Sequence, residues 1–167
     1  MDVANGNAGP DTEHARWMQR AVDLARTAVD SGSGGPFGAV IVRAGRIVGE
    51  GGNRVLADHD PTAHAEVVAI RDACARLEVH HLQGCVLYAS CEPCPMCLAS
   101  AYWAHLDAIY HACSRDDAAA IGFDDAFLHE ELARPVEARR LPMHRLDHPG
   151  ADEPMKLWAR LEDRVEY

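Results

Sequence analysis

The chain has 167 residues, of which 48% are hydrophobic and 25% charged, the balance of an ordinary globular protein of one domain. Its formal net charge of −10 disfavours a nucleic-acid binder, which normally carries a basic face. The longest stretch without a charged residue, Pro93–Leu106, is too short to span a membrane, and the first residues lack the features of a signal peptide. We therefore expect a cytoplasmic protein, in which six cysteines need an explanation other than disulfides.

Hydrophobic periodicity predicts alternating helices and strands, with one β-hairpin near the start. The predicted helices span about 11–30, 63–77, 94–105 and 154–165, and the predicted strands 39–42, 47–48, 85–89 and 108–111. This order predicts a three-layer α/β/α sandwich on a mixed sheet. We expect residues 1–10 to form a disordered tail and 11–167 to form a single domain that ends with a C-terminal helix and tail over 152–167.

Two segments carry side chains suited to chemistry, and each lies where a loop opens a predicted helix. The first segment contains His64 and Glu66, which can point toward one spot only if they lie in the first helical turn. The second contains Cys94 and Cys97, three residues apart and so on one helix face. Helix N-termini carry partial positive charge, which favours thiolates. One imidazole nitrogen and two thiolates are ligands suited to zinc, and they leave a fourth position open for water, as in catalytic sites.

Two other interpretations of the cysteines remain open. Cys94 and Cys97 could form a redox pair or half of a structural zinc site, and Cys91 could close such a site as a fourth ligand. A closed site would leave Glu66 without a role. The spacing H-x-E followed by P-C-x-x-C is also that of zinc deaminases, in which the glutamate is a general acid and base rather than a ligand.

The chain resembles the cytidine-deaminase-fold superfamily, and within it the bacterial guanine deaminases. The resemblance rests on the strings GGPFGAVIV (34–42), DPTAHAEVVAIR (60–71), SCEPCPMC (90–97), YWA (102–104), GFDDAF (122–127) and VEY (165–167). It implies a five-stranded mixed sheet, one zinc ion per chain and the hydrolysis of guanine to xanthine and ammonia in purine metabolism. In that reaction zinc activates a water molecule that attacks C2 of guanine, and Glu66 moves the proton to a ring nitrogen and then to the leaving ammonia.

The resemblance also implies further site residues and an assembly. Those implied to bind substrate are Asn53 at the base edge, Phe37 against the ring, Ala65, Asp125, which contacts the purine as a catalytic or a binding residue, and Tyr167, which closes the pocket. It implies a homodimer that can exchange its C-terminal segments. From the residues alone, Asn53 could be a turn residue, Phe37 a core residue and Asp125 part of a solvated acidic face.

Other activities are compatible with the same zinc motif. A tRNA adenosine deaminase would need a basic surface, but residues 154–167 have no net charge and residues 115–131 carry a net charge of −5. We therefore expect a small purine base as partner, and neither nucleic acid nor membrane. A deaminase of guanosine, cytosine or an s-triazine remains an alternative, and so does a non-catalytic interaction module that zinc stabilises.

Overall fold

The computed structural model describes residues 10–166 of the chain. Residues 1–9, which make up most of the expected tail, and Tyr167 lie outside the described residues. The chain divides after Asp125 into two units, which are described separately below.

The first unit, residues up to Asp125, contains three of the four predicted helices and all the predicted strands, together with two short helices that the periodicity did not predict. Its elements are α1 (Pro10–Asp30), β1 (Gly38–Arg43), β2 (Arg46–Gly52), α2 (Val55–Asp58), α3 (Ala65–Leu77), β3 (Cys85–Cys91), α4 (Pro95–Trp103), β4 (Ala108–Cys113) and α5 (Arg115–Ala120). The two unpredicted elements are α2 and α5, of four and six residues, too short to show an apolar face in the sequence.

The strands form one mixed sheet in the order β2-β1-β3-β4. β1 is antiparallel to both β2 and β3, whereas β3 and β4 are parallel. The mixed sheet is confirmed, but the expectation of five strands is wrong, since the described residues form four. After β4 the chain begins a helix because Ser114 and Asp117 form a capping box, each side chain accepting a hydrogen bond from the other's backbone N–H.

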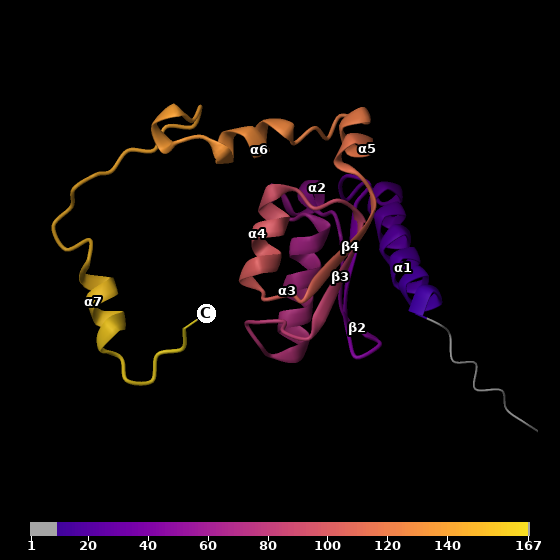
Figure 1. Ribbon diagram of the computed structural model, residues 1–167, viewed down its shortest axis with the longest axis horizontal. Coiled ribbons are helices and arrows are strands. Elements are labelled where there is room, and N and C mark those ends of the chain that lie inside the picture. The colour runs from indigo at the N-terminus through magenta and orange to yellow at the C-terminus, as the bar shows by residue number, and fades with distance from the viewer. Residues whose placement is uncertain (1–9, 167) are drawn as a thin grey trace, which may run out of the picture. The chain divides into compact units, whose positions relative to one another are not determined.

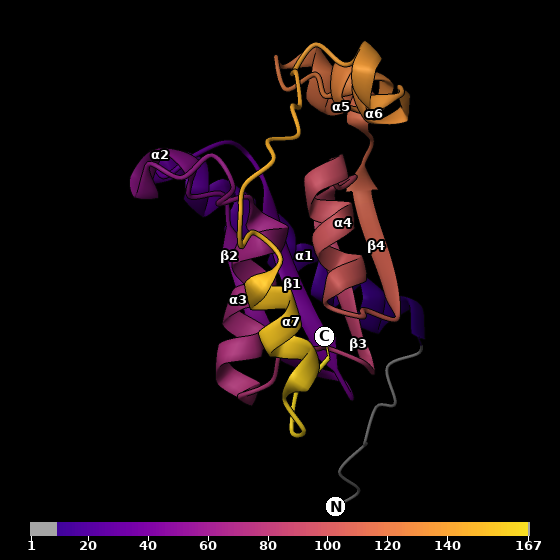
Figure 2. The ribbon, with the colours of Figure 1, turned by 90° about the vertical axis from the view of Figure 1, so that its left-hand side faces the viewer.

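The helices of this unit cover both faces of the sheet, which confirms the three-layer arrangement. α1 lies on one side of the strands, and α3 and α4 lie on the other (Figures 1 and 2). On the α3 side, the buried core joins Ile41 and Leu87 of the sheet to three alanines of α3. On the α1 side, Trp17 packs with Val40 and Tyr88.

Glycines in the hairpin let helices approach the sheet closely. A Cβ at Gly38 would collide with the backbone of α1. On the opposite face, a Cβ at Gly49 or Gly51 would collide with α3 at its alanines Ala65, Ala69 and Ala73. The start of α3 is therefore held against β2 by contacts between backbone and small side chains, which have few alternative conformations.

The second unit contains α6 (Ala126–Ala133), the 3₁₀ helix η1 (Val136–Ala138) and α7 (Glu153–Arg160). None of its described residues is buried. α7 ends earlier than the predicted helix over 154–165. The Leu161 N–H bonds to the Trp158 carbonyl, only three residues back, and the backbone at Leu161 becomes extended.

Within residues 10–166, no helix is both long enough and apolar enough to cross a membrane.

Candidate active site

Two helix starts place the predicted zinc ligands. His64 precedes α3 and Cys94 precedes α4, each with extended backbone angles and with no side-chain hydrogen bond that caps its helix. Their side chains are therefore free to leave the helix axis. Pro95 follows at the first position of α4, where a missing N–H costs little, and Cys97 lies in the first turn, fully buried.

The structure brings these three side chains together. His64 Nδ1 lies 3.6 Å from Cys94 Sγ and 3.5 Å from Cys97 Sγ, and the two sulfur atoms are 3.6 Å apart. A tetrahedral zinc ion, with Zn–S bonds of about 2.3 Å and Zn–N bonds of about 2.0 Å, requires edges of about 3.8 Å between sulfurs and about 3.5 Å between nitrogen and sulfur. The donor atoms thus have both the chemistry and the separation that zinc needs. Among the described residues, this trio is the group of histidines, cysteines or acids close enough to hold a metal ion.

The charges of the trio also suit a metal. The hydrogen bond between the Cys94 and Cys97 sulfur atoms, with help from His64, lowers the pKa of Cys94 to about 4 although burial opposes the shift. The same hydrogen bond and burial raise the pKa of Cys97, and the hydrogen bond with Cys94 raises the pKa of His64. Thiolate is therefore already favoured at Cys94, and thiolate is the form that binds zinc.

Glu66 lies beside the trio without belonging to it. It is in the first turn of α3, its exposed fraction is only 7%, and burial raises the pKa of its carboxyl group. Its side chain interacts with the Cys97 thiol and with the charges of Cys94 and His64. The start of α3 therefore turns both His64 and Glu66 toward one place, as the sequence predicted.

Cys91 has a different environment. Its thiol donates to the Ser114 carbonyl at 3.3 Å, and burial beside Cys113 raises its pKa to about 11. Cys91 is not a member of the trio, and all six cysteines are free of disulfides. The arrangement favours a three-ligand site over a closed site or a redox pair.

Asn53 is buried between two loops that lead to the site. Its Oδ1 accepts hydrogen bonds from the backbone N–H groups of Gly35, at 3.3 Å, and Val55, at 3.2 Å. Its own N–H donates to the Phe37 carbonyl. Over residues 10–166, nothing accepts a hydrogen bond from its amide nitrogen Nδ2, so Asn53 has a donor left for a ligand.

Phe37 is half-buried and packs against a ring that the sequence did not single out. The ring of Phe123 meets it edge-on, with centroids 5.0 Å apart and an interplanar angle of 89°. A Cβ at Gly35 would lie only about 3 Å from atoms of both rings, so a larger residue there would have to shift the aromatic pair.

Residues 11–113 match the protein family described as the cytidine and deoxycytidylate deaminase zinc-binding region. The chain belongs to this family of zinc deaminases. The deaminase is 47% identical to guanine deaminase of Bacillus subtilis over 154 residues, which cover 92% of this chain and 99% of that protein. A crystal structure of guanine deaminase from Bacillus subtilis superposes with a TM-score of 0.88 over 92% of this chain and 98% of that chain, also at 47% identity.

Two further relatives match a smaller part of the chain. A structure of a guanine deaminase from Nitrosomonas europaea matches at 33% identity, with a TM-score of 0.64, over 71% of this chain and 66% of that chain. The tRNA-specific adenosine deaminase of Aquifex aeolicus is 44% identical over 81 residues, which cover 48% of this chain and 53% of that protein. The family match makes zinc the cofactor of this deaminase, and among the described residues the trio is the group that can hold it.

Three further residues of the deaminase were predicted to bind substrate: Ala65, Asp125 and Tyr167. The side chain of Ala65 is fully buried in the core on the α3 side, so a contact with substrate would have to use its backbone. Asp125 is half-buried at the end of the first unit. Tyr167 lies outside the described residues. The roles of these three stay predictions.

Sequence reasoning missed two residues that contact this site or its loops. Phe123 lies within the string GFDDAF, but only the fold shows that it packs on Phe37. Glu92 lies within CEPCPMC, where the cysteines carry the metal motif. Its backbone N–H bonds to Cys113 at the end of β4, and its side chain bonds to Arg115 after β4.

Proposed function

We propose that this deaminase hydrolyses guanine to xanthine and ammonia. The observation that carries the proposal is the extent of the match with guanine deaminase of Bacillus subtilis, which includes nearly all of both chains. The match with the Aquifex aeolicus tRNA-specific adenosine deaminase covers about half of each. The match with the guanine deaminase thus extends over about twice as much of the chain, which supports the choice of a free purine base.

His64, Cys94 and Cys97 would hold the zinc ion in this reaction. When bound, zinc lowers the pKa of water so that a nucleophile forms at neutral pH. Glu66 takes the proton released from that water, because its carboxyl group lies beside the trio and is not needed as a ligand. It would deliver that proton to a ring nitrogen of guanine, where negative charge develops, and would then carry a second proton, from the hydroxyl group added at C2, to the amino group, which leaves as ammonia.

The pocket residues recognise the base by complementary contacts. Asn53 offers the Nδ2 donor, which suits the O6 and N7 acceptors of guanine. Its Oδ1 is already used by Gly35 and Val55, so the orientation of the amide is set before substrate arrives. Phe37 packs on the ring, and Ala65, Asp125 and Tyr167 complete the pocket as predicted from the family resemblance.

The charge of the chain supports a small substrate over RNA. The formal net charge is −10, and a tRNA deaminase would need cations around its site to neutralise phosphates. In α7 and the residues after it, Lys156 pairs with Asp152, and Arg164 pairs with Glu166. The positive charges of Lys156 and Arg164 are therefore already neutralised by carboxylates of this chain and are less available to bind phosphates.

We infer also that the deaminase is a cytoplasmic homodimer in which the C-terminal segments are exchanged. The supporting observation is the second unit, whose large apolar side chains are exposed, including those of Phe127, Leu146, Met155 and Trp158. A segment without a buried residue lacks a core of its own. A second copy that covers residues 126–167 would complete a single domain over 11–167, and the dimer would dissociate when those residues are deleted.

The decisive experiment is an ammonia-release panel with zinc-loaded protein. The substrates are guanine, guanosine, adenine, cytosine, cytidine, ammeline and a tRNA anticodon stem-loop. We expect ammonia from guanine, with xanthine as the second product. Turnover of another base but not guanine would contradict the substrate and leave the zinc mechanism intact, whereas no turnover of any would favour a non-catalytic module.

A further inference from the structure

Glu92 joins two loops that belong to different parts of the site. It lies between Cys91 at the end of β3 and the predicted ligand Cys94. Its backbone N–H donates to the Cys113 carbonyl at 2.9 Å, and its carboxylate Oε2 accepts from the Arg115 backbone N–H at 3.2 Å. The loop that carries Cys94 is thereby tied to the first residue of α5.

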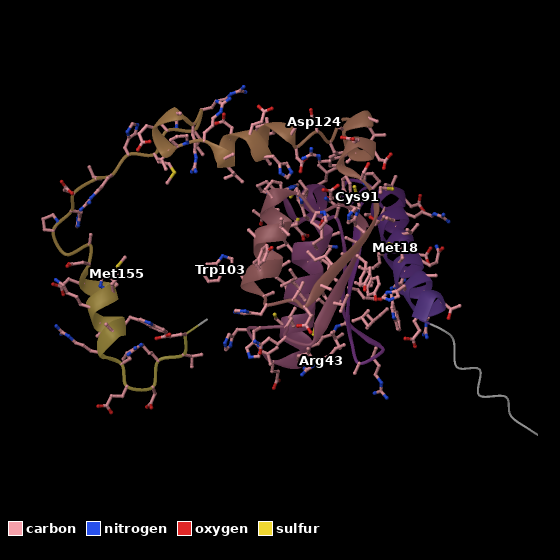
Figure 3. The ribbon with its side chains drawn as sticks, in the orientation of Figure 1. Met18, Arg43, Cys91, Trp103, Asp124 and Met155 are labelled. Atoms are coloured by element: carbon pink, nitrogen blue, oxygen red, sulfur yellow. The ribbon has the colours of Figure 1, made fainter. Side chains whose placement is uncertain are left out.

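A further hydrogen bond strengthens the same connection. The Cys91 thiol donates to the Ser114 carbonyl, and Cys91 lies opposite Cys113 in the parallel register of β3 and β4. Figure 3 labels Cys91 at this end of the sheet. A substitution of the Glu92 side chain removes one bond of this connection, the bond from the Arg115 N–H to the Glu92 carboxylate. Because its acceptor is charged, this bond is stronger than a bond between neutral groups.

Packing alone does not fix the position of α5. None of its residues is buried. A cavity of about 240 Å³ lies beside it, lined by Asp117, Ala118 and Ile121 on one side and by Phe37 on another. The hydrogen bonds at the first residues of α5 therefore contribute more to fixing its position than they would in a helix with buried side chains.

A movement of α5 would carry Phe123 with it. The Phe123 N–H bonds to the Ala118 carbonyl at 3.0 Å, so Phe123 is anchored to the last turn of this short helix. The ring of Phe123 in turn packs edge-on against Phe37. Glu92 is thus at one end of a chain of contacts, and the aromatic pair is at the other.

We propose that Glu92 is a positioning residue for the base. It holds α5, and through α5 it holds Phe123 against Phe37 at a fixed place relative to the Cys94 loop. The effect on substrate rests on the proposed guanine deamination, whereas the effect on α5 does not. Glu92 acts through Phe123 and does not itself contact substrate or metal.

Steady-state kinetics of three variants test the effect on substrate. Glu92→Ala removes the acceptor, Glu92→Gln keeps an acceptor oxygen without the charge, and Asp116→Ala removes a neighbouring exposed carboxylate as a matched control. For Glu92→Ala we expect KM for guanine to rise about tenfold, with kcat within about threefold of wild type and one zinc per chain retained. Glu92→Gln should restore most of the KM, and Asp116→Ala should match wild type.

An unchanged KM in Glu92→Ala would overturn the proposal. So would loss of zinc, because it would show that Glu92 supports the Cys94 loop alone. A double-mutant cycle with Phe123→Leu provides a further criterion. Because Glu92 is proposed to act through Phe123, the two effects on KM must be less than additive, and additive effects would contradict the proposal.

Hydrogen exchange tests the effect on α5 without any substrate. In zinc-loaded protein, amides of residues 113–123 should exchange about tenfold faster in Glu92→Ala than in wild type or Asp116→Ala. If wild type proves inert toward guanine, this measurement still decides the role of Glu92, and unchanged exchange would refute it. If Glu92→Ala does not fold, Glu92→Asp, which withdraws the carboxylate by one methylene, replaces it in every measurement with the same expected direction.

Discussion

Gly34 lies so close to Asn53 that a Cβ at position 34 would occupy the space of the Asn53 Oδ1 atom. Gly34→Ala is therefore expected to displace the Asn53 side chain and to break its hydrogen bonds with Gly35 and Val55. We expect a loss of stability of about 1–3 kcal/mol, as for other overpacked sites, and a larger relative loss of kcat/KM for guanine. Urea unfolding and steady-state kinetics measure the two effects.

The Asn53→Ala background provides the control for this clash. With the side chain shortened, Gly34→Ala should cost less stability than it does in the wild-type chain. An equal cost in both backgrounds would mean that the strain comes from elsewhere in the loop.

Glu66→Gln should abolish turnover and leave the metal in place. The amide has the shape of the carboxyl group but cannot take a proton from water, so we expect kcat to fall by about 10²–10⁴-fold. Metal analysis should still find one zinc per chain, because Glu66 lies beside the ligands and is not one of them. Glu78→Gln, at the opposite end of α3, is the matched control, and comparable activity in the two variants would exclude Glu66 from catalysis.

Zinc removal should destabilise the starts of α3 and α4. The trio joins these two helix starts, so a chelator is expected to lower the melting temperature as well as the activity, and added zinc should restore both. When free zinc exceeds its dissociation constant by about 1,000-fold, the stabilisation amounts to about 4 kcal/mol.

Single cysteine variants identify the ligands behind that effect. Cys94→Ala should lose zinc and its stabilisation, whereas Cys113→Ser, at an exposed cysteine outside the trio, should keep both. Full zinc content in Cys94→Ala would rule out Cys94 as a ligand.

The ion pair between Arg20 and Glu50 should make stability depend on pH. Arg20 on α1 donates two hydrogen bonds to the Glu50 carboxylate on β2, at 2.7 and 2.9 Å, and this holds the pKa of Glu50 below its usual 4.5. A carboxyl group with a lowered folded-state pKa stabilises the fold fully above its unfolded-state pKa, and the stabilisation disappears as the pH falls through the folded-state pKa. Glu50→Gln should therefore cost about 1 kcal/mol near pH 7, and the difference from wild type should shrink as the pH falls below 4.5 and vanish once the pH is below the folded-state pKa of Glu50.

Urea unfolding of wild type and Glu50→Gln across this pH range measures the difference. A cycle with Arg20→Ala assigns it to the pair, since the two substitutions must then be non-additive at neutral pH. A difference that grows on acidification would have the wrong sign for this ion pair.

The sequence predicted the metal trio because its geometry is mostly local. Cys94 and Cys97 are three residues apart at one helix start, whereas His64 and Glu66, two residues apart, can meet only because the helix boundary falls between them, with His64 before α3 and Glu66 in its first turn. The motif spacing of zinc deaminases relates the two pairs to each other. The four strands and their mixed order were similarly accessible, because apolar runs and a hairpin turn mark them. The expected fifth strand came from the family resemblance alone, since the sequence pattern marks only four strands, and the described residues form four.

Other parts of the site depend on contacts between distant segments. Phe37 and Phe123 are 86 residues apart, and no local pattern relates them. Glu92 bonds to Arg115 only because β3 and β4 are parallel neighbours that bring their ends together. The bond between Asn53 and the Gly35 loop likewise joins segments 18 residues apart, in addition to the local turn bond from Val55 to the Asn53 side chain.

The close approach of α3 to β2 limits how this enzyme can acquire new substrates. At Gly49 and Gly51 every substitution adds atoms against the α3 backbone, so mutations cannot reshape the pocket from that side. The loops over 34–37 and 121–125 surround the aromatic pair. Apart from Gly34 and Gly35, where an added Cβ meets Asn53 or the two rings, they include exposed or half-buried side chains that can change size. Laboratory selection for deamination of another base should therefore accumulate substitutions in these two loops, with β2 and the first turns of α3 left unaltered.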